Sequence, residues 1–220
     1  MVRMAMPEIV GLLDALGFRG GCTVEAMVAT RNADGSQNAA PMGVTRTGSD
    51  LLEIKPYRSS ATYRNLSERG EACVNLTDNP CLFLVTAFKR EDLRGFKRPQ
   101  IDEDLSLGSA DASVFVEVLS SGEVSRDRGR FPCRALSIEV RRRLPRAFSR
   151  GRAEAIEAVV HATRIEAYMR LGRRGDAEKP YKRFNECKGV VEGVSSPDSA
   201  EASVMEALEA LISRWMKALR

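Results

Sequence analysis

The sequence has a single histidine, His161, and no pair of cysteines at the C-x-x-C spacing of zinc sites. A metal centre built from several histidines is therefore excluded. The five cysteines fit reduced thiols in a cytoplasmic protein rather than a disulfide framework. No apolar run approaches the roughly 20 residues of a membrane-spanning helix, and the N-terminus lacks a signal-peptide pattern. We therefore expect a cytoplasmic protein with no metal and no membrane contact.

The net charge is also small, only +4 over 220 residues. A basic run could bind nucleic-acid phosphates, but Phe148 is its only aromatic neighbour. The run consists of Arg141, Arg142, Arg143 and Arg146, with Arg150 and Arg152. A solvated or partner-facing surface explains this run better. A nucleic-acid-binding β-barrel is therefore the least favoured function. With 43% hydrophobic residues, the chain can bury one substantial core.

Short strands separated by turn residues dominate the first 141 residues. Apolar residues at helical spacing predict one helix over 7–16, and a second helix is expected between Ser60 and Gly70. The close spacing of the strands favours a closed antiparallel barrel over a βαβ sheet. The strands are expected at 23–30, 37–45, 51–55, 72–76, 81–88, 112–119 and 131–141.

The last third of the chain has a helical pattern. Apolar spacing predicts a helix over 150–171, and Ser196 followed by Pro197 predicts the start of a last helix. The segment between them is taken as a polar turn at 172–179 and a stretch of no clear type at 181–191. We therefore predict an α+β fold, mainly β, with two domains. These are a barrel domain, residues 1–144, and a helical subdomain, residues 145–220, packing on the barrel or on a second subunit.

The stretch 55–66 reads as the end of a strand, a basic turn rich in hydroxyl groups, and the start of a helix. Pro56 ends the strand because it has no N–H for the ladder. Ser59 or Ser60 can cap the helix, whose N-terminal N–H groups and dipole suit a phosphate. An ordinary capped helix with solvated cations is the alternative. The side chains that could join the phosphate are Lys55, Arg58, Ser59, Ser60 and Thr62.

Pro41 and Gly43 interrupt the strand expected over 37–45. Proline removes a ladder donor and glycine removes a side chain, so a regular central strand disfavours both. We therefore expect an edge or a bulge at which a flat ligand can lie close to the backbone. A barrel corner without a ligand is the alternative.

Three segments in this order, Asn38–Gly43, Arg58–Leu66 and Glu71–Asn75, resemble the FMN-binding split β-barrel proteins. Within the second segment, Ser60, Thr62 and Leu66 match a loose Ser-x-Thr-x-x-x-Leu pattern of the flavin reductase-like branch. The sequence looks closest to an archaeal branch whose members bind FMN but lack an assigned reaction. The resemblance is most specific over residues 23–88.

The resemblance implies FMN as the cofactor and a homodimer with FMN at the subunit interface. It implies that Tyr57 and Tyr63 pack on the ribityl chain or the ring, and that Asn75 forms a hydrogen bond nearby. Packing in the core or the turn is the alternative for both tyrosines. The other implied contacts are to the isoalloxazine ring, from Pro41, Met42 and Gly43, and to the phosphate, from Lys55, Arg58, Ser59, Ser60 and Thr62.

The resemblance also implies a flavin-dependent oxidoreductase with a nicotinamide or a deazaflavin as electron donor. Because the flavin itself carries out hydride chemistry, no protein nucleophile is required and no catalytic residue is assigned. Met42 and Gly43 stand where several flavin reductases carry Thr or Ser, a departure that concerns catalysis more than binding. A non-catalytic flavin-binding or sensing protein is the alternative. His161 is expected at a surface or interface rather than at a catalytic site.

Overall fold

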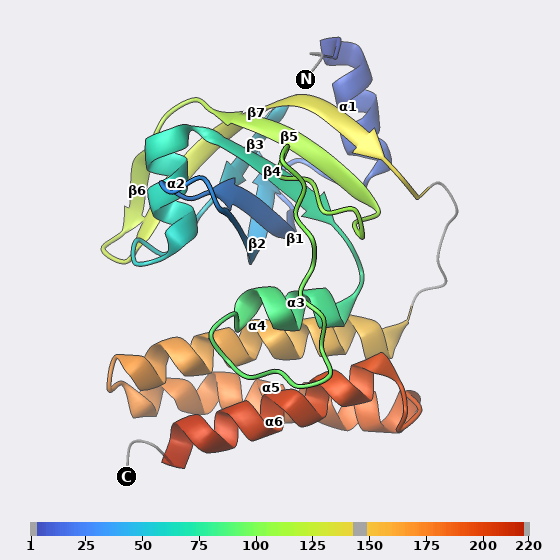
Figure 1. Ribbon diagram of the computed structural model, residues 1–220, viewed down its shortest axis with the longest axis vertical. Coiled ribbons are helices and arrows are strands. Elements are labelled where there is room, and N and C mark those ends of the chain that lie inside the picture. Colours follow the sequence, from blue (N-terminus) through green and yellow to red (C-terminus); the bar gives the residue numbers. More distant parts are fainter. Residues whose placement is uncertain (1–3, 143–148, 218–220) are drawn as a thin grey trace. The chain divides into compact units, whose positions relative to one another are not determined.

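A computed structural model describes residues 4–142 and 149–217, which divide into two compact units (Figure 1). The first unit contains residues 4–77 and 99–142, and the second contains residues 78–98 and 149–217. The helical unit therefore includes residues 78–98, which the sequence placed in the barrel domain, residues 1–144. The predicted boundary at 144–145 lies outside the described residues.

The first unit is an antiparallel β-barrel. Its strands follow the order β3-β2-β1-β4-β5-β7-β6, and β3 also pairs with β7, so that six of them close into a barrel and β6 extends β7 (Figure 1). The predicted closed barrel is confirmed. The strands are β1 (Thr23–Arg31), β2 (Gln37–Arg46), β3 (Leu51–Ile54), β4 (Glu71–Leu76), β5 (Ala112–Val118), β6 (Gly122–Ser125) and β7 (Arg128–Val140).

Helix α1 (Met6–Ala15) packs on the barrel core, as its helical spacing predicts. Ile9 and Leu13 are buried together with the apolar side chains of the barrel interior. The buried guanidinium of Arg46 donates hydrogen bonds to the carboxylate of Asp14, at 2.5 Å, and to the carbonyl of Phe18, at 2.9 Å. An arginine from β2 thus holds the end of α1 and the chain that follows it.

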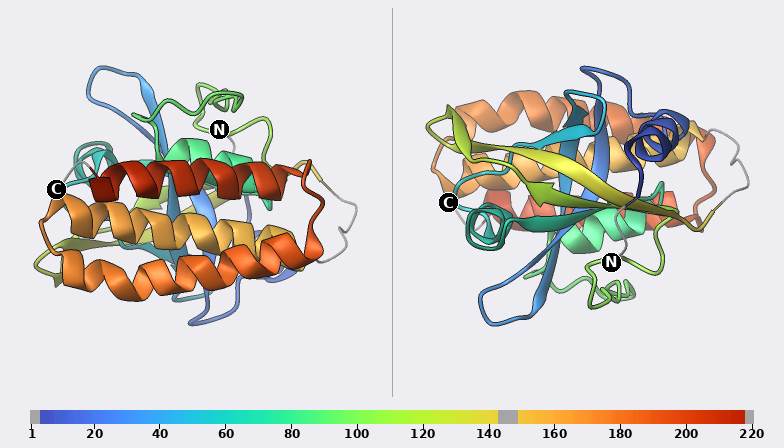
Figure 2. Two further views of the ribbon diagram at one scale, coloured as in Figure 1. Left: turned by 90° about the horizontal axis from the view of Figure 1, so that it is seen from below. Right: turned by 90° about the horizontal axis from the view of Figure 1, so that it is seen from above.

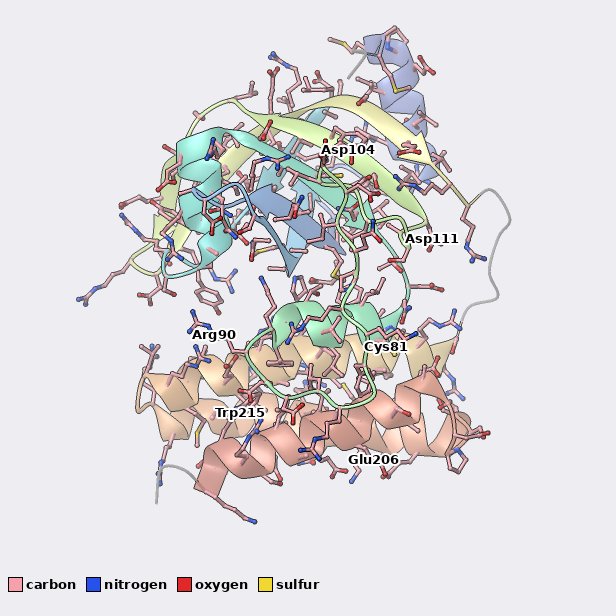
Figure 3. The ribbon with its side chains drawn as sticks, in the orientation of Figure 1. Cys81, Arg90, Asp104, Asp111, Glu206 and Trp215 are labelled. Atoms are coloured by element: carbon pink, nitrogen blue, oxygen red, sulfur yellow. The ribbon has the colours of Figure 1, made fainter. Side chains whose placement is uncertain are left out.

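The second unit is helical throughout its described secondary structure. Figure 2 shows the long helices of this unit side by side, and α4 contacts α3, α5 and α6. The rings of Phe88 and Trp215, 5.4 Å apart, pack the end of α6 against the segment after α3 (Figure 3). No helix within the described ranges is long and apolar enough to cross a membrane. The four helices are α3 (Pro80–Ala87), α4 (Arg150–Arg170), α5 (Arg174–Val194) and α6 (Ala200–Lys217).

Residues 81–88, predicted as a buried strand, form helix α3, so that prediction is wrong. A short run of continuous apolar residues has no period by which a helix and a strand can be told apart. The deciding residues precede the run. The side chain of Asn79 accepts a hydrogen bond from the backbone N–H of Cys81, at 3.0 Å, and Pro80 occupies the first helical position.

Residues 172–179, predicted as a polar turn, and the undetermined stretch 181–191 belong largely to one helix, α5. Gly175 and Pro180 both lie inside this helix. Burial of apolar side chains such as Phe184 and Val191 outweighs the cost of the proline. The last helix, α6, is confirmed, although it begins at Ala200 rather than at Pro197.

Candidate functional site

The barrel has an unpaired strand edge where β2 extends beyond β3. Strand β2 pairs with β1 continuously from Gln37 to Thr45, but it pairs with β3 only at Val44, Thr45 and Arg46. Over 37–43, the other edge of β2 therefore has no partner strand in the described part of the chain. The predicted edge at Pro41 and Gly43 is confirmed. Backbone N–H and C=O groups on this edge can pair with the polar rim of a flat ligand.

The outer surface of β2 is flat at this edge. Met42 and Val44 pack toward the barrel core, so alternation turns Pro41 and Gly43 outward. A Cβ atom added at Gly43 would lie 2.8 Å from Cγ2 of Thr23 on β1. The neighbouring strand therefore already requires a glycine at this position. No ligand is needed to explain this glycine. The glycine nevertheless leaves the outer surface of β2 without a side chain at position 43.

Helix α2 (Ala61–Arg69) begins with a capped first turn. The hydroxyl of Ser60 accepts a hydrogen bond from the backbone N–H of Tyr63, at 3.1 Å, and donates one to the carbonyl of Tyr57, at 2.7 Å. The backbone N–H group of Ala61 remains for an outside acceptor, as at other helix N-termini. The predicted helix is confirmed, with Ser60 as its cap and the left-handed Gly70 at its end.

Two buried hydrogen bonds fix this first turn beside the open edge of β2. The side-chain amide of Asn38 donates to the hydroxyl of Thr62, at 3.3 Å, and that of Asn65 donates to the hydroxyl of Thr30, at 2.9 Å. Thr62 is only 1% exposed. Its hydroxyl, which the resemblance places at a phosphate, faces the barrel instead. Thr62 therefore acts here by positioning the helix.

The β6–β7 hairpin supports the turn that leads into α2. The backbone N–H of Arg58 donates to the carbonyl of Asp127, at 2.9 Å, and that of Gly129 donates to the carbonyl of Pro56, at 3.1 Å. Between these two bonds, Tyr57 and Arg128 form an isolated antiparallel bridge. Sequence reasoning missed this hairpin. The sequence feature that could have indicated the hairpin is the placement of Arg128 and Arg130 on either side of Gly129.

A buried carboxylate organises the cations at the end of β3. Glu53 is 4% exposed, and its oxygens bind Lys55, at 2.5 Å, and Arg130. Burial raises the pKa of Glu53, but the hydrogen bonds from Lys55 and Arg130 outweigh this effect, so that its pKa lies below the ordinary value. Glu53 is therefore charged at neutral pH and fixes two cations on the outer side of the barrel.

Arg58 lies on the turn before α2 and Arg128 on the β6–β7 hairpin, and the two have different partners. Arg58 forms an ion pair with Glu123 of β6, and the guanidinium of Arg128 lies over the ring of Tyr57, 4.0 Å from its centroid. The turn and the hairpin together present four cations, Lys55, Arg58, Arg128 and Arg130. Within the described residues, only two carboxylates, Glu53 and Glu123, pair with them. Ser59 is exposed beside them. The excess positive charge suits an anionic ligand.

The two tyrosines of the turn differ in role. The ring of Tyr63 packs edge-to-face on Phe131, with centroids 5.4 Å apart, and covers Gly129 so closely that a Cβ atom there would lie 2.3 Å from Tyr63 Cε2. Tyr63 therefore packs in the core, which is the alternative given above for this residue. Tyr57 is 39% exposed, and its ring carries the guanidinium of Arg128.

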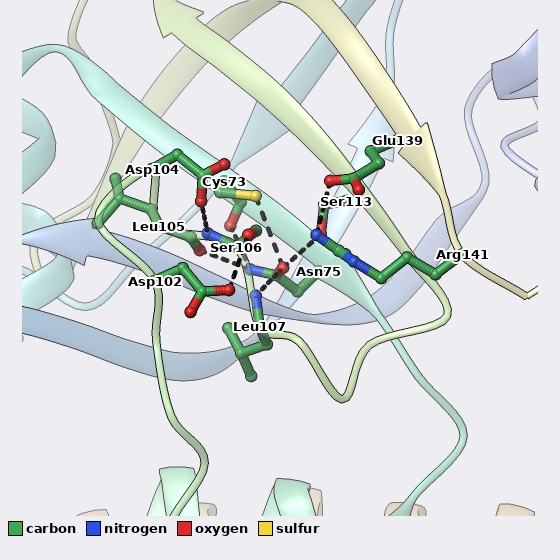
Figure 4. Close-up of polar contacts among 10 residues, drawn as sticks. All are labelled: Cys73, Asn75, Asp102, Asp104, Leu105, Ser106, Leu107, Ser113, Glu139 and Arg141. Atoms are coloured by element: carbon green, nitrogen blue, oxygen red, sulfur yellow. Dashed lines mark hydrogen bonds and ion pairs between the residues drawn. The ribbon is translucent and has the colours of Figure 1, made fainter. Parts of the chain in front are cut away.

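Asn75 is fully buried and holds a loop of the barrel unit (Figure 4). Its amide NH2 donates to the carbonyl of Leu105, at 3.2 Å. Its oxygen accepts from the N–H of Leu107, at 2.9 Å, and from the hydroxyl of Ser113, at 2.7 Å. This network supports the left-handed backbone of Leu105. The structure therefore engages Asn75 in the loop and does not join it to the turn at 55–60.

The remaining candidates have other partners. Arg141 donates to Ser113, at 2.8 Å, and Arg142 donates to Asp111, at 2.7 Å, so both are used within the barrel unit. Arg143, Arg146 and Phe148 of the predicted basic run lie outside the described residues. Arg152, also of this run, pairs with Asp78, at 2.7 Å, and with Glu201, at 3.4 Å. Across the two described ranges, no cluster of three His, Cys, Asp or Glu side chains could hold a metal ion.

The helical unit contains a concavity and the single histidine. A cavity of about 620 Å³ is lined in part by Cys81, Arg94 and Glu206. Burial raises the pKa of Cys81, so that its thiol is protonated at neutral pH and is a poor nucleophile. His161, expected at a surface, is buried on α4, with Nε2 3.3 Å from Glu157.

Comparison with known proteins agrees with this architecture. Residues 24–142 match the family model described as the N-terminal domain of a protein of unknown function (DUF447). The structure is similar to that of an FMN-bound DUF447 protein from Methanosarcina mazei, with a TM-score of 0.69 and 22% sequence identity over 90% of this chain and 98% of the other. This likeness shows the fold of the FMN-binding split barrels.

Weaker similarities extend to flavin reductases. The styrene monooxygenase flavin reductase of Pseudomonas putida S12 matches with a TM-score of 0.46 and 18% identity, over 54% of this chain and 80% of the other. Flavoredoxin from Methanosarcina acetivorans matches with a TM-score of 0.45 and 14% identity, over 56% and 72% of the two chains.

Proposed function

We propose that this chain, which belongs to the DUF447 family, binds FMN between the unpaired edge of β2 and the first turn of α2. The observation that supports the proposal is the hydrogen bond between Asn38 and Thr62, because it joins β2 directly to the first turn of α2. The unpaired edge of β2 over 37–43 offers backbone groups and a flat outer surface to the isoalloxazine ring. The first turn of α2 offers an N–H group to the phosphate.

The chemistry of these residues fits a flavin mononucleotide. A phosphate carries between one and two negative charges at neutral pH, and the turn and hairpin have excess positive charge. The phosphate would be held by the N–H group of Ala61 and by the hydroxyl of Ser59. Arg58 and Lys55 would add charge, while Pro41, Met42 and Gly43 would lie along the ring. Tyr57, exposed on the same turn, would cover the ribityl chain with the ring face that Arg128 does not occupy.

A titration of the flavin-free full-length protein with FMN tests this proposal. We expect quenching of flavin fluorescence that saturates at about one FMN per chain, as tight cofactor binding requires. The double variant Arg58→Ala with Lys55→Ala should bind FMN at least about tenfold more weakly, because charge-assisted contacts are lost. Absence of quenching in the unaltered protein, at FMN concentrations well above that of the protein, would reject the proposal.

FMN, when bound, supplies hydride and electron transfer, and the chain binds and orients it. We infer a flavin-dependent oxidoreductase that accepts electrons from a nicotinamide or a deazaflavin. Mixing the FMN-loaded protein with NADH, NADPH or a reduced deazaflavin in a stopped-flow spectrometer tests this. Rapid bleaching near 450 nm by one donor supports an enzyme. No bleaching by any of them would leave a non-catalytic flavin-binding protein.

We also propose a homodimer with FMN at the subunit interface, as in the split barrels that the sequence resembles. The open edge of β2 supports this, since unpaired strand edges are usually covered. Sedimentation equilibrium with and without FMN tests it. A dimer that tightens with FMN agrees with a shared site, whereas a monomer in both conditions contradicts it.

A further inference from the structure

Arg128, which sequence reasoning did not assign, occupies a distinctive place beside the proposed phosphate site. It starts β7 and faces Tyr57 across an antiparallel bridge, so that the two side chains project to the same face. Its guanidinium lies 4.0 Å from the centroid of the Tyr57 ring, and one of its N–H groups donates to the carbonyl of Lys55, at 3.2 Å. The residue is therefore fixed at two points.

The charge partners set Arg128 apart from its neighbours. Lys55 and Arg130 both bind Glu53, and Arg58 binds Glu123. For Arg128, no carboxylate lies within ion-pair distance in the portion of the chain that is described. Its positive charge is thus balanced by an aromatic face and a carbonyl dipole rather than by an anion.

A stacked guanidinium is suited to recognise a phosphate. Arg presents five N–H donors in a planar fork, and stacking on a ring uses the face of that plane while leaving its edge open. Only one donor of Arg128 is used by the carbonyl of Lys55. The fork is already oriented, so little side-chain entropy is lost when an anion binds.

We propose that Arg128 is the residue with which this chain selects a phosphorylated flavin over an unphosphorylated one, through a bidentate contact to the terminal phosphate. This inference rests on the proposed binding of FMN and goes beyond it. In this proposal, the β6–β7 hairpin is the part of the barrel that contacts the phosphate. Arg58 keeps its pairing with Glu123, and Tyr57 orients the fork of Arg128.

The experiment measures the dissociation constants of FMN and riboflavin for the full-length protein and three variants. In the unaltered protein, FMN should bind at least about a hundredfold more tightly than riboflavin. Arg128→Ala should reduce this ratio at least about tenfold by weakening FMN alone, because riboflavin has no phosphate. Arg128→Lys keeps the charge without the fork and should give an intermediate ratio.

Arg126→Ala is the matched control, because Arg126 is exposed at the tip of the same hairpin and its loss removes the same charge. It should leave the ratio within about twofold. Thermal unfolding of each variant shows whether it folds. If Arg128→Ala leaves the ratio unchanged or weakens both flavins equally, the inference is overturned. If the unaltered protein binds neither flavin, the proposed function itself fails.

Discussion

Ser60 connects the local structure of the turn to the proposed phosphate site. Its hydroxyl both caps α2, through the N–H of Tyr63, and closes the turn, through the carbonyl of Tyr57. A residue used in this way has little capacity left to bind a phosphate with its side chain. Its contribution is to fix the orientation of the N–H group of Ala61.

Ser60→Ala should lower the free energy of unfolding by about 1 kcal/mol, because the capping hydrogen bond is lost. Urea denaturation followed by circular dichroism measures this difference. Ser67→Ala, on the exposed side of the same helix, is the control and should be neutral or slightly stabilising, because alanine is the better helix former. Equal stability of Ser60→Ala and the unaltered protein would contradict the capping role.

At the scale of elements, the β6–β7 hairpin and α2 meet at one glycine. Gly129 lies under the ring of Tyr63, and there is no space between them for a Cβ atom. The hairpin can therefore approach the turn at 55–60 closely enough to form its backbone hydrogen bonds. This contact joins a residue of α2 to one more than sixty positions later.

Gly129→Ala should destabilise the barrel by about 1–3 kcal/mol, because Tyr63 or the hairpin must move. Gly122→Ala in the same hairpin is the matched control. A Cβ atom there would meet only Arg130 Cβ, at 4.0 Å, so stability should change little. Melting temperatures of the two variants give the comparison. If both variants have the melting temperature of the unaltered protein, the close packing at Gly129 does not contribute to stability.

Helix α4 contains a titrating group within the helical unit. Burial lowers the pKa of His161, and Arg164 and Arg183 act in the same direction, whereas Glu157 and Glu186 oppose them. The folded state therefore prefers neutral histidine. Its contribution to stability is complete above the ordinary pKa of 6.5 and is lost as the pH falls below that value, because the unfolded chain then binds the proton more readily.

His161→Gln should flatten this dependence on pH. Melting temperatures of the unaltered protein and the variant, measured from pH 7.5 to pH 5, provide the test. The unaltered protein should lose more stability than the variant over this range, since glutamine does not titrate. Parallel losses in the two proteins would show that other groups, such as the paired carboxylates, cause the acid sensitivity.

The sequence predicted those elements whose signals are local. Ser60 and Gly70 mark the ends of α2, and Pro41 with Gly43 marks the unpaired edge of β2. Helix α3 was missed because its apolar run has no period and packing decides its form. The pairing of Tyr57 with Arg128 was missed because it depends on a strand register set across the barrel, which a single sequence does not display.

At the scale of the whole molecule, the chain leaves the barrel at Thr77 and returns at Pro99 before it enters the last three helices. The helical unit is thus built from two separate segments. A division at residue 144 would separate α3 from α4 and α6, with which it packs. In the proposed FMN site, by contrast, all assigned residues lie in the barrel unit.

The most direct measurement is a crystal structure of the full-length protein grown with FMN. We expect an isoalloxazine ring along the edge of β2 at Pro41–Gly43. We also expect a phosphate within hydrogen-bonding distance of the N–H group of Ala61 and of the guanidinium of Arg128. A flavin bound in the helical unit, or one on the barrel with its phosphate away from the N-terminus of α2, would contradict it.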